Sequence, residues 1–442
     1  MNAHEYVSWF RHSSPYINAH RGKTFVIMLG GEALEHPNFS NIIHDIALLN
    51  SLGVRLVLIH GTRPQIEARL QAKGLPNRLH LHQRITDEDT LECVKEAVGV
   101  ARINIEALMS MGLANSPMHN ARIRVVGGNF VAARPIGVSE GQDMYYTGEV
   151  RRIDASAINR LLNDNAIVLL SNIGYSPTGE AFNLSVEEVA TQAAIALKAD
   201  KLIAFSADQG VVNSRGQVIN ELVVPKAERL IRLHSARMGA DEPISELARV
   251  LQALVGACKG GVSRTHLISY RQDGALLTEL FSREGSGTMV VEQSYEQVRQ
   301  ATIEDVGGLL ELLRPLEEAG ILVRRSRELL EAEIERFTLI DRDGTIIACA
   351  ALYPFPDEGC AELACVAVHS QYRGGDRGEQ LLEKIERRAR KQGIKELFVL
   401  TTRTAHWFLE HGFAPAPMSR LPAKKQALYN FQRNSKVFFK SL

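Results

Sequence analysis

Short apolar segments alternate with longer amphipathic segments through the first two thirds of the chain. The apolar segments at 24–29, 54–59, 123–126, 166–170 and 201–205 have the length and composition of buried strands. Segments with helical periodicity lie between them, for example at 39–52, 90–111 and 187–198. Because parallel strands need long crossover connections, this order predicts an α/β fold with a mostly parallel sheet covered on both faces.

A different pattern begins near residue 298. Predicted strands at 337–340, 345–352, 361–368 and 396–401 accompany a helix at 378–392, and an Asp-Gly turn joins the first two strands. A further strand and helix at 298–313 precede them, with Thr302 as helix N-cap and Asp305 three residues later. The chain therefore divides into two α/β domains.

A glycine-rich turn joins the strand at 361–368 to the helix at 378–392. Backbone N–H groups converge in such a turn, the first helical amides lack intrahelical partners, and the helix dipole favours negative charge. Arg373 and Arg377 add positive charge beside it. The turn predicts a pyrophosphate site, although it has neither the P-loop spacing nor the dinucleotide-binding spacing of glycines.

The spacing of this turn resembles the coenzyme A loop of the GCN5-related N-acetyltransferases (GNAT), Gln/Arg-x-x-Gly-x-Gly/Ala. Asp376 stands where that family usually has glycine. The order of strands and the segment 405–413, which ends in Gly-Phe, resemble the same family. The resemblance implies a mixed sheet and a site for acetyl-CoA as co-substrate. The residues that it assigns to this site are Val366, Val368, Arg373, Gly374, Gly375, Asp376, Arg377 and Gly378.

The first domain resembles the three-layer α/β/α amino-acid kinase fold, and most closely N-acetylglutamate kinase. The resemblance rests on the segments 25–31 and 56–61, on Asn183 with the helix after it, and on Lys201-Leu-Ile. The first two segments end in Gly-Gly and His-Gly, at the carboxyl ends of strands where open α/β sheets bind ligands.

Kinase chemistry is missing from this domain. The kinases place a phosphate-neutralising lysine where this sequence has Met28, whose thioether carries no charge. Ser206-Ala207 replaces the family's Thr-Asp, and the second phosphate-facing lysine, before Gly260, has no obvious counterpart. Lys23 points to the opposite strand face and does not substitute. We therefore expect a kinase fold without kinase activity.

Two segments resemble the arginine-binding region of arginine-sensitive N-acetylglutamate kinases and synthases, namely 266–270 and 279–288. A carboxylate such as Glu279 can pair bidentately with a guanidinium. The stretch 10–18 resembles the N-terminal helix that links subunits of those enzymes into rings, which implies a homo-oligomer, with a hexamer as one candidate. The implied L-arginine site comprises Tyr16, His266, Glu279, Gly285 and Gly287. Alternatively, His266 is a satisfied histidine at a strand edge and Glu279 a solvated helix residue.

A silent amino-acid kinase-like domain followed by a GNAT domain resembles the bacterial N-acetylglutamate synthases. The resemblance implies an oligomerisation helix at 1–21, an arginine-sensing domain at 22–287, a linker at 288–297 and the GNAT domain at 298–442. The implied reaction transfers acetyl from acetyl-CoA to the α-amine of L-glutamate. This is the first step of arginine biosynthesis, and we expect L-arginine to inhibit it.

Acetyl transfer to an amine needs a base, a donor to the oxyanion and a donor to the departing thiolate. Glu362 matches the family's proposed base, with a solvated strand carboxylate as the alternative. A backbone N–H at 365–366 would bind the oxyanion. Many relatives use a tyrosine at the position of Phe408, which cannot serve, whereas Thr401 matches the hydroxyl of the synthases. Because an aliphatic alcohol is a poor acid, hydrogen bonding by Thr401 is as plausible as proton donation.

Glutamate carries two carboxylates, which planar guanidinium groups bind well. Arg325 and Arg433, with Ser435, match the family's substrate-binding positions. Cys365 has no evident base beside it, so we expect it to line the pocket. The histidines at 80 and 82 lack a third residue at metal-ligand spacing, and we assign no metal.

Composition further limits the possible partners and the cellular compartment of the protein. The chain has 51 Lys and Arg against 51 Asp and Glu, which favours neither nucleic acid nor an anionic membrane as partner. Its 5 cysteines form no C-x-x-C pair, as expected in a reducing compartment. No apolar stretch approaches the roughly 20 residues of a membrane span, and the N-terminus lacks a signal-peptide pattern. We expect a cytoplasmic protein.

Three other functions fit parts of the pattern. They are an active amino-acid kinase, a non-catalytic arginine sensor that regulates a partner, and an N-acetyltransferase for another amine such as a protein lysine or a polyamine. Met28 argues against the kinase. Arg325 and Arg433 argue against polyamines because they would repel a cation. The sensor would not need Glu362 for its output.

Overall fold

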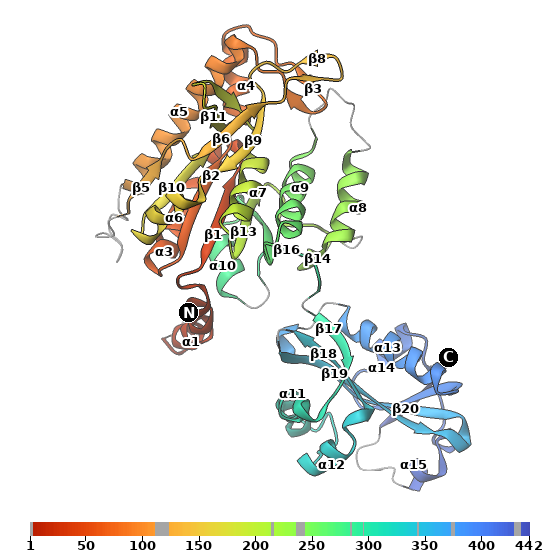
Figure 1. Ribbon diagram of the computed structural model, residues 1–442. Coiled ribbons are helices and arrows are strands. Elements are labelled where there is room, and N and C mark those ends of the chain that lie inside the picture. The colour runs from red at the N-terminus through yellow and green to blue at the C-terminus, as the bar shows by residue number, and fades with distance from the viewer. Residues whose placement is uncertain are drawn as a thin grey trace. The chain divides into compact units, whose positions relative to one another are not determined.

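The computed structural model is shown in Figure 1. It describes residues 3–110, 123–213, 216–235, 244–282, 285–294, 296–342, 344–372, 376–427 and 435–442. Backbone contacts divide the chain into two compact units, Met1–Ser294 and Tyr295–Leu442. Strand β16 (Thr288–Val291) belongs to the sheet of the first unit, and β17 (Glu296–Gln300) to that of the second. The connection between these strands is therefore shorter than the linker expected at 288–297.

The first unit is built on an 8-stranded sheet with the order β14-β16-β15-β13-β1-β2-β10-β5. The pairs within it are parallel except β15 with β16, so the predicted mostly parallel sheet is confirmed. The strands are β1 (Thr24–Leu29), β2 (Arg55–His60), β5 (Val125–Gly127), β10 (Ile167–Ser171), β13 (Lys201–Ser206), β14 (Glu221–Val223), β15 (Arg264–Ser269) and β16.

Helices cover both faces of this sheet (Figure 1). Phe25 and Ile27 of β1 pack toward α3 (Phe39–Ser51), α5 (Glu88–Ser110) and α10 (Ala275–Phe281), whereas Val26 and Met28 pack toward the opposite layer. That layer contains α6 (Ala155–Asn163), α7 (Val186–Ala196), α8 (Val224–Ser235) and α9 (Glu246–Lys259). Because every residue of β1 is buried, the strand reads as a continuous apolar run.

Smaller elements extend the first unit. A 4-stranded sheet has the order β12-β11-β6-β9, formed by Ala181–Asn183, Ile173–Tyr175, Val131–Pro135 and Gly148–Ile153. Two hairpins join β3 (Leu79–His80) to β4 (Gln83–Arg84) and β7 (Val138–Ser139) to β8 (Gln142–Asp143). The remaining helices are α1 (Ala3–His20), α2 (Gly31–Glu35) and α4 (Arg63–Ala72). The predicted N-terminal helix is thus present, and His20 Nε2 lies 2.8 Å from the carbonyl oxygen of Leu280.

The second unit contains a mixed 7-stranded sheet with the order β17-β18-β19-β20-β21-β23-β22. Its strands after β17 are β18 (Phe337–Arg342), β19 (Thr345–Phe355), β20 (Cys360–Val368), β21 (Glu396–Thr401), β22 (Ala414–Pro415) and β23 (Lys436–Ser441). Its helices are α11 (Val306–Glu318), α12 (Arg327–Ala332), α13 (Arg377–Lys391), α14 (Ala405–Glu410) and α15 (Ala423–Ala427). Thr302 and Asp305 form the predicted capping box before α11.

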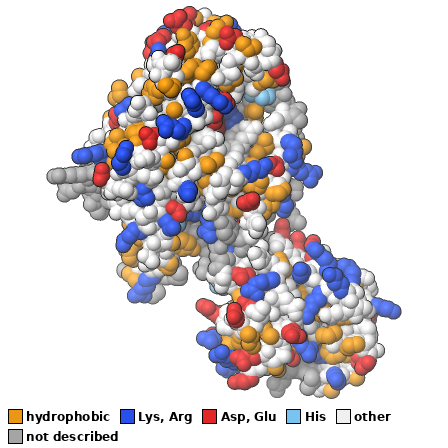
Figure 2. All heavy atoms as spheres, viewed as in Figure 1, with side chains coloured by type: hydrophobic (Ala, Val, Ile, Leu, Met, Phe, Trp, Pro, Cys, Tyr) orange, Lys and Arg blue, Asp and Glu red, His pale blue; other side chains and the backbone are white. Residues whose placement is uncertain are grey.

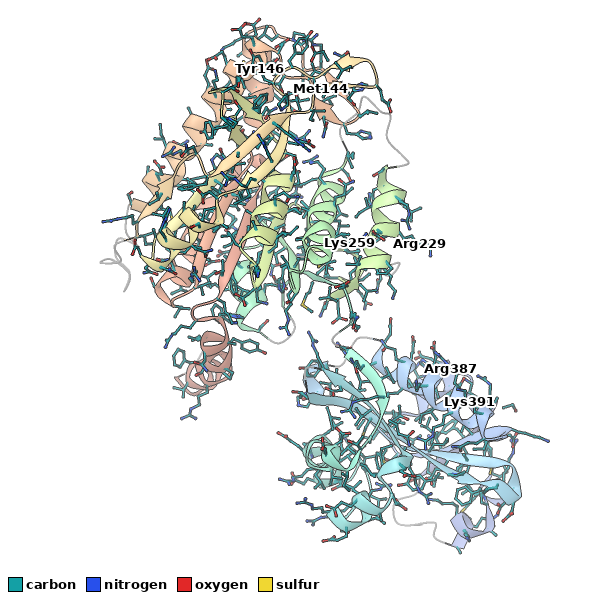
Figure 3. The ribbon with its side chains drawn as sticks, in the orientation of Figure 1. Met144, Tyr146, Arg229, Lys259, Arg387 and Lys391 are labelled. Carbon is teal, nitrogen blue, oxygen red and sulfur yellow. The ribbon has the colours of Figure 1, made fainter. Side chains whose placement is uncertain are left out.

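Helix α13 is amphipathic. Leu381, Ile385 and Ala389 are fully buried against the sheet, whereas the side chain of Arg387 is 67% exposed. Lys and Arg side chains gather over this helix in the space-filling view (Figure 2), and Arg387 and Lys391 point outward from it in Figure 3. The basic run at its end is therefore a solvated helix face, as predicted. Within the described ranges, no helix is both long and apolar enough to cross a membrane.

Candidate active site

Two adjacent parallel strands of the second unit separate and open a wedge. β20 pairs with β21 only from Cys360↔Glu396 to Glu362↔Phe398. Beyond Glu362, β20 remains paired with β19 as far as Val368, and β21 remains paired with β23 as far as Thr401. The facing edges of β20 and β21 therefore lack each other as partners, and backbone groups in the wedge are available to a ligand.

A β-bulge interrupts the pairing of β20 with β19 in the stretch where β20 has separated from β21. Ala364 pairs with Ala351 and Ala367 with Cys349, so two residues of β20, Cys365 and Val366, oppose a single residue of β19. Cys365 has a φ of 52°, in the left-handed region that costs a residue with a side chain about 1–2 kcal/mol. This irregular backbone lies where the sequence predicts an N–H donor to the oxyanion.

A cavity of about 320 Å³ occupies the wedge. Its lining comes from the loop before α12, from both separated strands, from α14 and from the segment before β23. It brings together these residues predicted from the sequence: Arg325, Glu362, Cys365, Val366, Thr401 and Ser435. Arg373, Gly374, Gly375 and Arg433, also predicted, lie outside the described residues.

Glu362 lies at the point where the strands separate and is 7% exposed. Its Oε2 is 2.5 Å from the Nζ of Lys425 on α15, and both side chains line the cavity. The sequence analysis did not single out Lys425, because a lysine on a five-residue helix has no periodic or motif signal. The carboxylate is therefore an ion-pair partner inside the cavity and not a solvated strand residue.

Thr401 ends β21 on the opposite wall of the wedge and is 8% exposed. Its hydroxyl oxygen accepts a hydrogen bond from the backbone N–H of Thr404 at 3.1 Å and lies 2.9 Å from the hydroxyl of Thr404. The hydroxyl is thus held in a fixed orientation by the turn after the strand. Phe408 also lines the cavity and supplies only apolar surface.

Cys365 and Arg325 complete the described lining. Burial raises the pKa of the Cys365 thiol to about 11, so the side chain is a neutral thiol near pH 7 and not a nucleophile. The backbone N–H of Arg325 donates to Glu317 and its guanidinium donates to the carbonyl of Val323. These contacts fix the loop that carries the guanidinium along the cavity wall.

The predicted coenzyme A turn leads into α13. Asp376 is the N-cap of this 15-residue helix and its exposed side chain makes no capping hydrogen bond, so it leaves the first-turn amides available to an anion. A Cβ atom at Gly378 would lie 3.0 Å from the Trp407 ring, which explains the glycine. Val366 and Val368 are half-buried on β20.

The guanidinium of Arg377, which is predicted to add positive charge beside this turn, is paired within the second unit. Its Nε and Nη2 donate to Glu296 of β17, and its Nη1 donates to the carbonyl of Tyr372. The pairing with Glu296 could not be inferred from the sequence, where the two residues are far apart. Arg377 therefore fixes the start of α13.

The first unit assembles most of the predicted arginine site. His266 Nδ1 lies 2.6 Å from Glu279 Oε1, and Glu279 Oε2 accepts hydrogen bonds from the N–H groups of Ser286 (2.6 Å) and Gly287 (3.0 Å). Burial alone would raise the pKa of Glu279. The contacts with His266 and these amides outweigh burial and lower this pKa to about 2. Glu279 is thus a buried, ionised and partnered carboxylate, not a solvated one.

Other members of this cluster explain its glycines. Gly285 has a φ of 73°, and a Cβ atom at Gly287 would lie 1.9 Å from the carbonyl oxygen of Leu267. Lys201, which the sequence analysis did not assign here, places Nζ 3.2 Å from His266 Nε2. Tyr16 is half-buried on α1, which packs near α10, but no contact joins Tyr16 to Glu279 among those observed.

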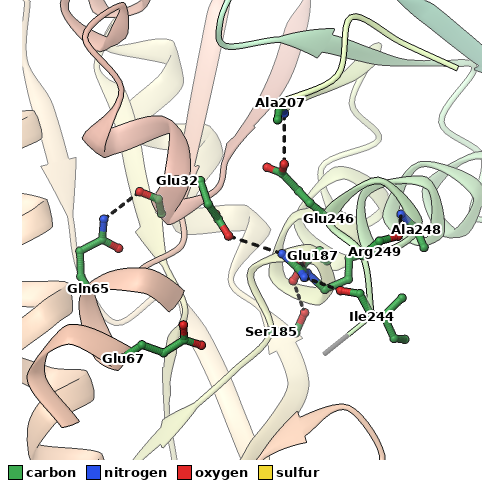
Figure 4. A network of polar contacts seen from close by, with 12 residues as sticks. Glu32, Gln65, Glu67, Ser185, Glu187, Ala207, Ile244, Glu246, Ala248 and Arg249 are labelled. Atoms are coloured by element: carbon green, nitrogen blue, oxygen red, sulfur yellow. Dashed lines mark hydrogen bonds and ion pairs between the residues drawn. The ribbon is translucent and has the colours of Figure 1, made fainter. Parts of the chain in front are cut away.

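A second cavity of about 290 Å³ lies at the carboxyl ends of β1 and β2, with Met28 in its wall. Glu32, Glu187 and Glu246 lie in this wall with Arg249, which pairs with Glu187 and Glu32, while the Glu246 carboxylate points to Ala207 (Figure 4). Arg249 donates to Glu187 at 2.8 Å, and Glu246 accepts from the N–H of Ala207 at 3.1 Å. Carboxylates and guanidinium groups thus share this wall, which also contains Arg63 and Arg84.

Lys259 and Lys23 do not line this cavity. Lys259 ends α9, points toward α8 near Arg229 and pairs with Glu228 (Figure 3). Lys23 pairs with Asp200 at 3.1 Å, at the amino end of β1. Among the residues that the structure describes, no lysine therefore lines the cavity beside Met28.

Comparisons with known proteins agree with both units. The amino acid kinase family model matches residues 23–269 and the acetyltransferase (GNAT) family model matches residues 308–413. The amino-acid acetyltransferase of Azotobacter vinelandii is 61% identical over 99% of this chain and 100% of its own length, and that of Ectopseudomonas mendocina is 60% identical over the same shares. The chain belongs to the amino-acid acetyltransferase family.

A solved structure supports the same assignment for the whole chain. N-acetylglutamate synthase from Neisseria gonorrhoeae, complexed with coenzyme A and L-arginine, is 36% identical, with a TM-score of 0.77 over 99% of both chains. A second structure of that enzyme, with coenzyme A and N-acetyl-glutamate, has a TM-score of 0.61 over the same shares. An amino-acid kinase-like unit followed by a GNAT unit is therefore the architecture of this family.

Proposed function

We propose that this protein transfers the acetyl group of acetyl-CoA to the α-amine of L-glutamate, yielding N-acetyl-L-glutamate and coenzyme A. The observation that carries the proposal is the cavity between β20 and β21, which joins a buried carboxylate, a hydroxyl and a guanidinium. The carboxylate is Glu362, the hydroxyl belongs to Thr401 and the guanidinium to Arg325. The Neisseria relative, crystallised with coenzyme A and N-acetyl-glutamate, supports this substrate pair.

Acetyl-CoA would enter the wedge with its pyrophosphate at the start of α13. The uncapped first-turn amides of that helix suit a pyrophosphate. The irregular backbone at Cys365 and Val366 suits the thioester, because an unpaired N–H there can donate to its carbonyl oxygen. Arg373, Gly374 and Gly375 remain part of this proposed site on the strength of the turn's spacing.

The α-ammonium loses two protons in the reaction: one is released to solvent through the base, and the other ends on the sulfur of coenzyme A. Glu362 removes a proton from the α-ammonium, and the amine then forms a C–N bond with the thioester carbon. The nitrogen then gives up its second proton as the oxyanion collapses and the C–S bond breaks, and the departing thiolate of coenzyme A takes that proton up. Thr401, whose hydroxyl oxygen accepts from the N–H of Thr404, would donate a hydrogen bond to the departing sulfur.

The cavity favours a dicarboxylic amino acid over other amines. Arg325 lines it with a guanidinium, and Ser435 adds a hydroxyl on the wall before β23. Arg433 belongs to the same proposed carboxylate site by its match to the family. A polyamine would face these cations without an anion to offer, so it would be repelled.

The first unit would act as an arginine sensor without kinase activity. The methionine at position 28, in a cavity whose described lining contains no lysine, opposes phosphoryl transfer. His266, Glu279, Gly285 and Gly287 form one cluster, to which the proposal adds Tyr16. Because Glu279 already uses three of its roughly four lone-pair sites, a guanidinium that binds it bidentately would displace His266 or one of the amides of Ser286 and Gly287.

A direct assay tests the proposal. The purified protein, given acetyl-CoA, should acetylate L-glutamate in preference to other amino acids, and L-arginine should inhibit. Glu362→Gln should lose about 100-fold or more in turnover while still binding acetyl-CoA. Turnover of ATP with N-acetylglutamate would instead support a kinase, and full output from Glu362→Gln would support a non-catalytic sensor.

A further inference from the structure

Lys425 lies directly against the proposed base. Its Nζ is 2.5 Å from Glu362 Oε2, with the Glu362 side chain 9% exposed and the Lys425 side chain 28% exposed. A carboxylate buried to this degree is costly without a partner, and the ammonium compensates its charge. Because both groups line the cavity, the contact sits where a substrate must enter.

Helix α15 holds Lys425 in this place. The side-chain amide of Gln426 donates to the carbonyls of Ser419 (3.0 Å) and Leu421 (2.7 Å). Leu421 is 3% exposed and packs with Phe398 of β21. The short helix is thus anchored to the sheet beside the cavity, and the lysine reaches Glu362 from a fixed backbone position.

The ammonium of Lys425 occupies the position that a substrate amine needs. A substrate α-ammonium must come within hydrogen-bond distance of Glu362 to lose its proton. Two unit charges of the same sign about 4 Å apart repel by about 4 kcal/mol at an effective dielectric constant near 20. Lys425 must therefore leave Glu362 as the amino acid enters. The nearest anion it can then meet is the α-carboxylate, which is attached to the same carbon as the amine.

We propose that Lys425 is a substrate-positioning residue whose ammonium moves from Glu362 to the α-carboxylate of the incoming amino acid. The inference rests on the proposed acetylation of L-glutamate. It leaves Arg325 and Ser435 for the side-chain carboxylate. An amine without an α-carboxylate offers Lys425 no new partner, so the lysine stays on the base and such amines are excluded.

Steady-state kinetics of Lys425→Met with three substrates test this assignment. The substrates are L-glutamate, its α-amide and its side-chain amide, L-glutamine. The variant should show a KM for L-glutamate raised ~10-fold or more, with the KM for acetyl-CoA unchanged, because one charged hydrogen bond is lost. The preference of the parent for L-glutamate over the α-amide should shrink by a similar factor. The preference for L-glutamate over L-glutamine should remain as large as in the parent.

The chain offers a matched control. Lys424 is exposed on the same helix, so Lys424→Met should leave all three preferences unchanged, and Lys425→Arg should restore most of the lost affinity. Lys425→Gln gives the same reading if Lys425→Met fails to fold. An unchanged KM for L-glutamate would overturn the proposal, as would a change in the L-glutamine preference alone. A parent enzyme that does not acetylate L-glutamate would instead refute the proposed function before any variant is compared.

Discussion

The guanidinium of Arg377 donates two hydrogen bonds to the carboxylate of Glu296, from Nε at 3.1 Å and from Nη2 at 2.6 Å. Arg342 donates to the same carboxylate at 3.3 Å, and the ring of Tyr372 lies within cation–π range of both arginines. The first residue of α13 is thereby tied to β17. Such a bidentate pair fixes orientation as well as distance, so it sets where the helix amides point.

Glu296→Gln should weaken acetyl-CoA binding. The amide retains the shape but loses the charge-assisted pair, so the start of α13 becomes less firmly placed. We expect the KM for acetyl-CoA to rise about 3- to 10-fold, with little change in the KM for L-glutamate, as one charged hydrogen bond is weakened. Initial rates with each substrate varied in turn measure this.

Glu383→Gln is the control for that variant. Glu383 lies on the same helix, and its exposed side chain pairs with Arg387 one turn on. Such surface pairs contribute little, so neither KM should change. Tighter acetyl-CoA binding in Glu296→Gln would show that the ion pair instead holds Arg377 away from the phosphates.

Thr401→Val should slow turnover without preventing binding. Valine keeps the branched shape of threonine in a buried wall but removes the donor to the departing sulfur. We expect kcat to fall about 10-fold or more, since the lost hydrogen bond is to a developing charge. Thr401→Ser should keep most of the activity. If the kcat of Thr401→Val equals that of the parent, the leaving group needs no hydrogen-bond donor at this position.

The strands and helices that were predicted correctly are those with a local sequence pattern. The fully buried β1 reads as an unbroken apolar run, and α13 follows a glycine-rich turn with regular apolar spacing. The three-residue strands β11 and β12 were not predicted, because so short a segment carries no measurable alternation.

The candidate site was also predicted only in part. Glu362 and Thr401 were predicted from their match to the positions of the base and the hydroxyl in the resembling synthases, and both line one cavity. Sequence analysis did not predict the contact of Glu362 with Lys425 or that of Arg377 with Glu296. Each contact joins residues that are distant in sequence and is decided by tertiary packing. Charged partners of this kind have no periodicity, so only the folded chain identifies them.

Glu279→Gln should reduce inhibition by L-arginine. The neutral amide cannot pair with a guanidinium as a carboxylate does, so the inhibitor concentration for half-inhibition should rise ~10-fold or more. Inhibition curves at fixed acetyl-CoA and L-glutamate measure the change. Glu292→Gln, a substitution at an exposed position in the same unit, should be as sensitive to L-arginine as the parent. Unaltered sensitivity in Glu279→Gln would remove this residue from the arginine site.

The buried His60 should make the first unit acid-sensitive. It ends β2, is 1% exposed, and burial lowers its pKa from 6.5 to about 4. Between these two pH values the unfolded chain binds a proton that the folded chain does not, so stability falls as the pH drops through this window. Above it both states are neutral, and below it both are protonated.

His60→Leu should therefore lose less stability on acidification than the parent. Leucine shares the strand face with Leu56 and Leu58 and suits this apolar site. Between pH 7 and pH 5 the parent should lose about 2 kcal/mol more than the variant, as a shift of this size requires. Urea unfolding followed by circular dichroism at the two pH values measures the difference. His44→Leu, at an exposed position on α3, should lose as much as the parent, and equal losses in the parent and His60→Leu would contradict the prediction.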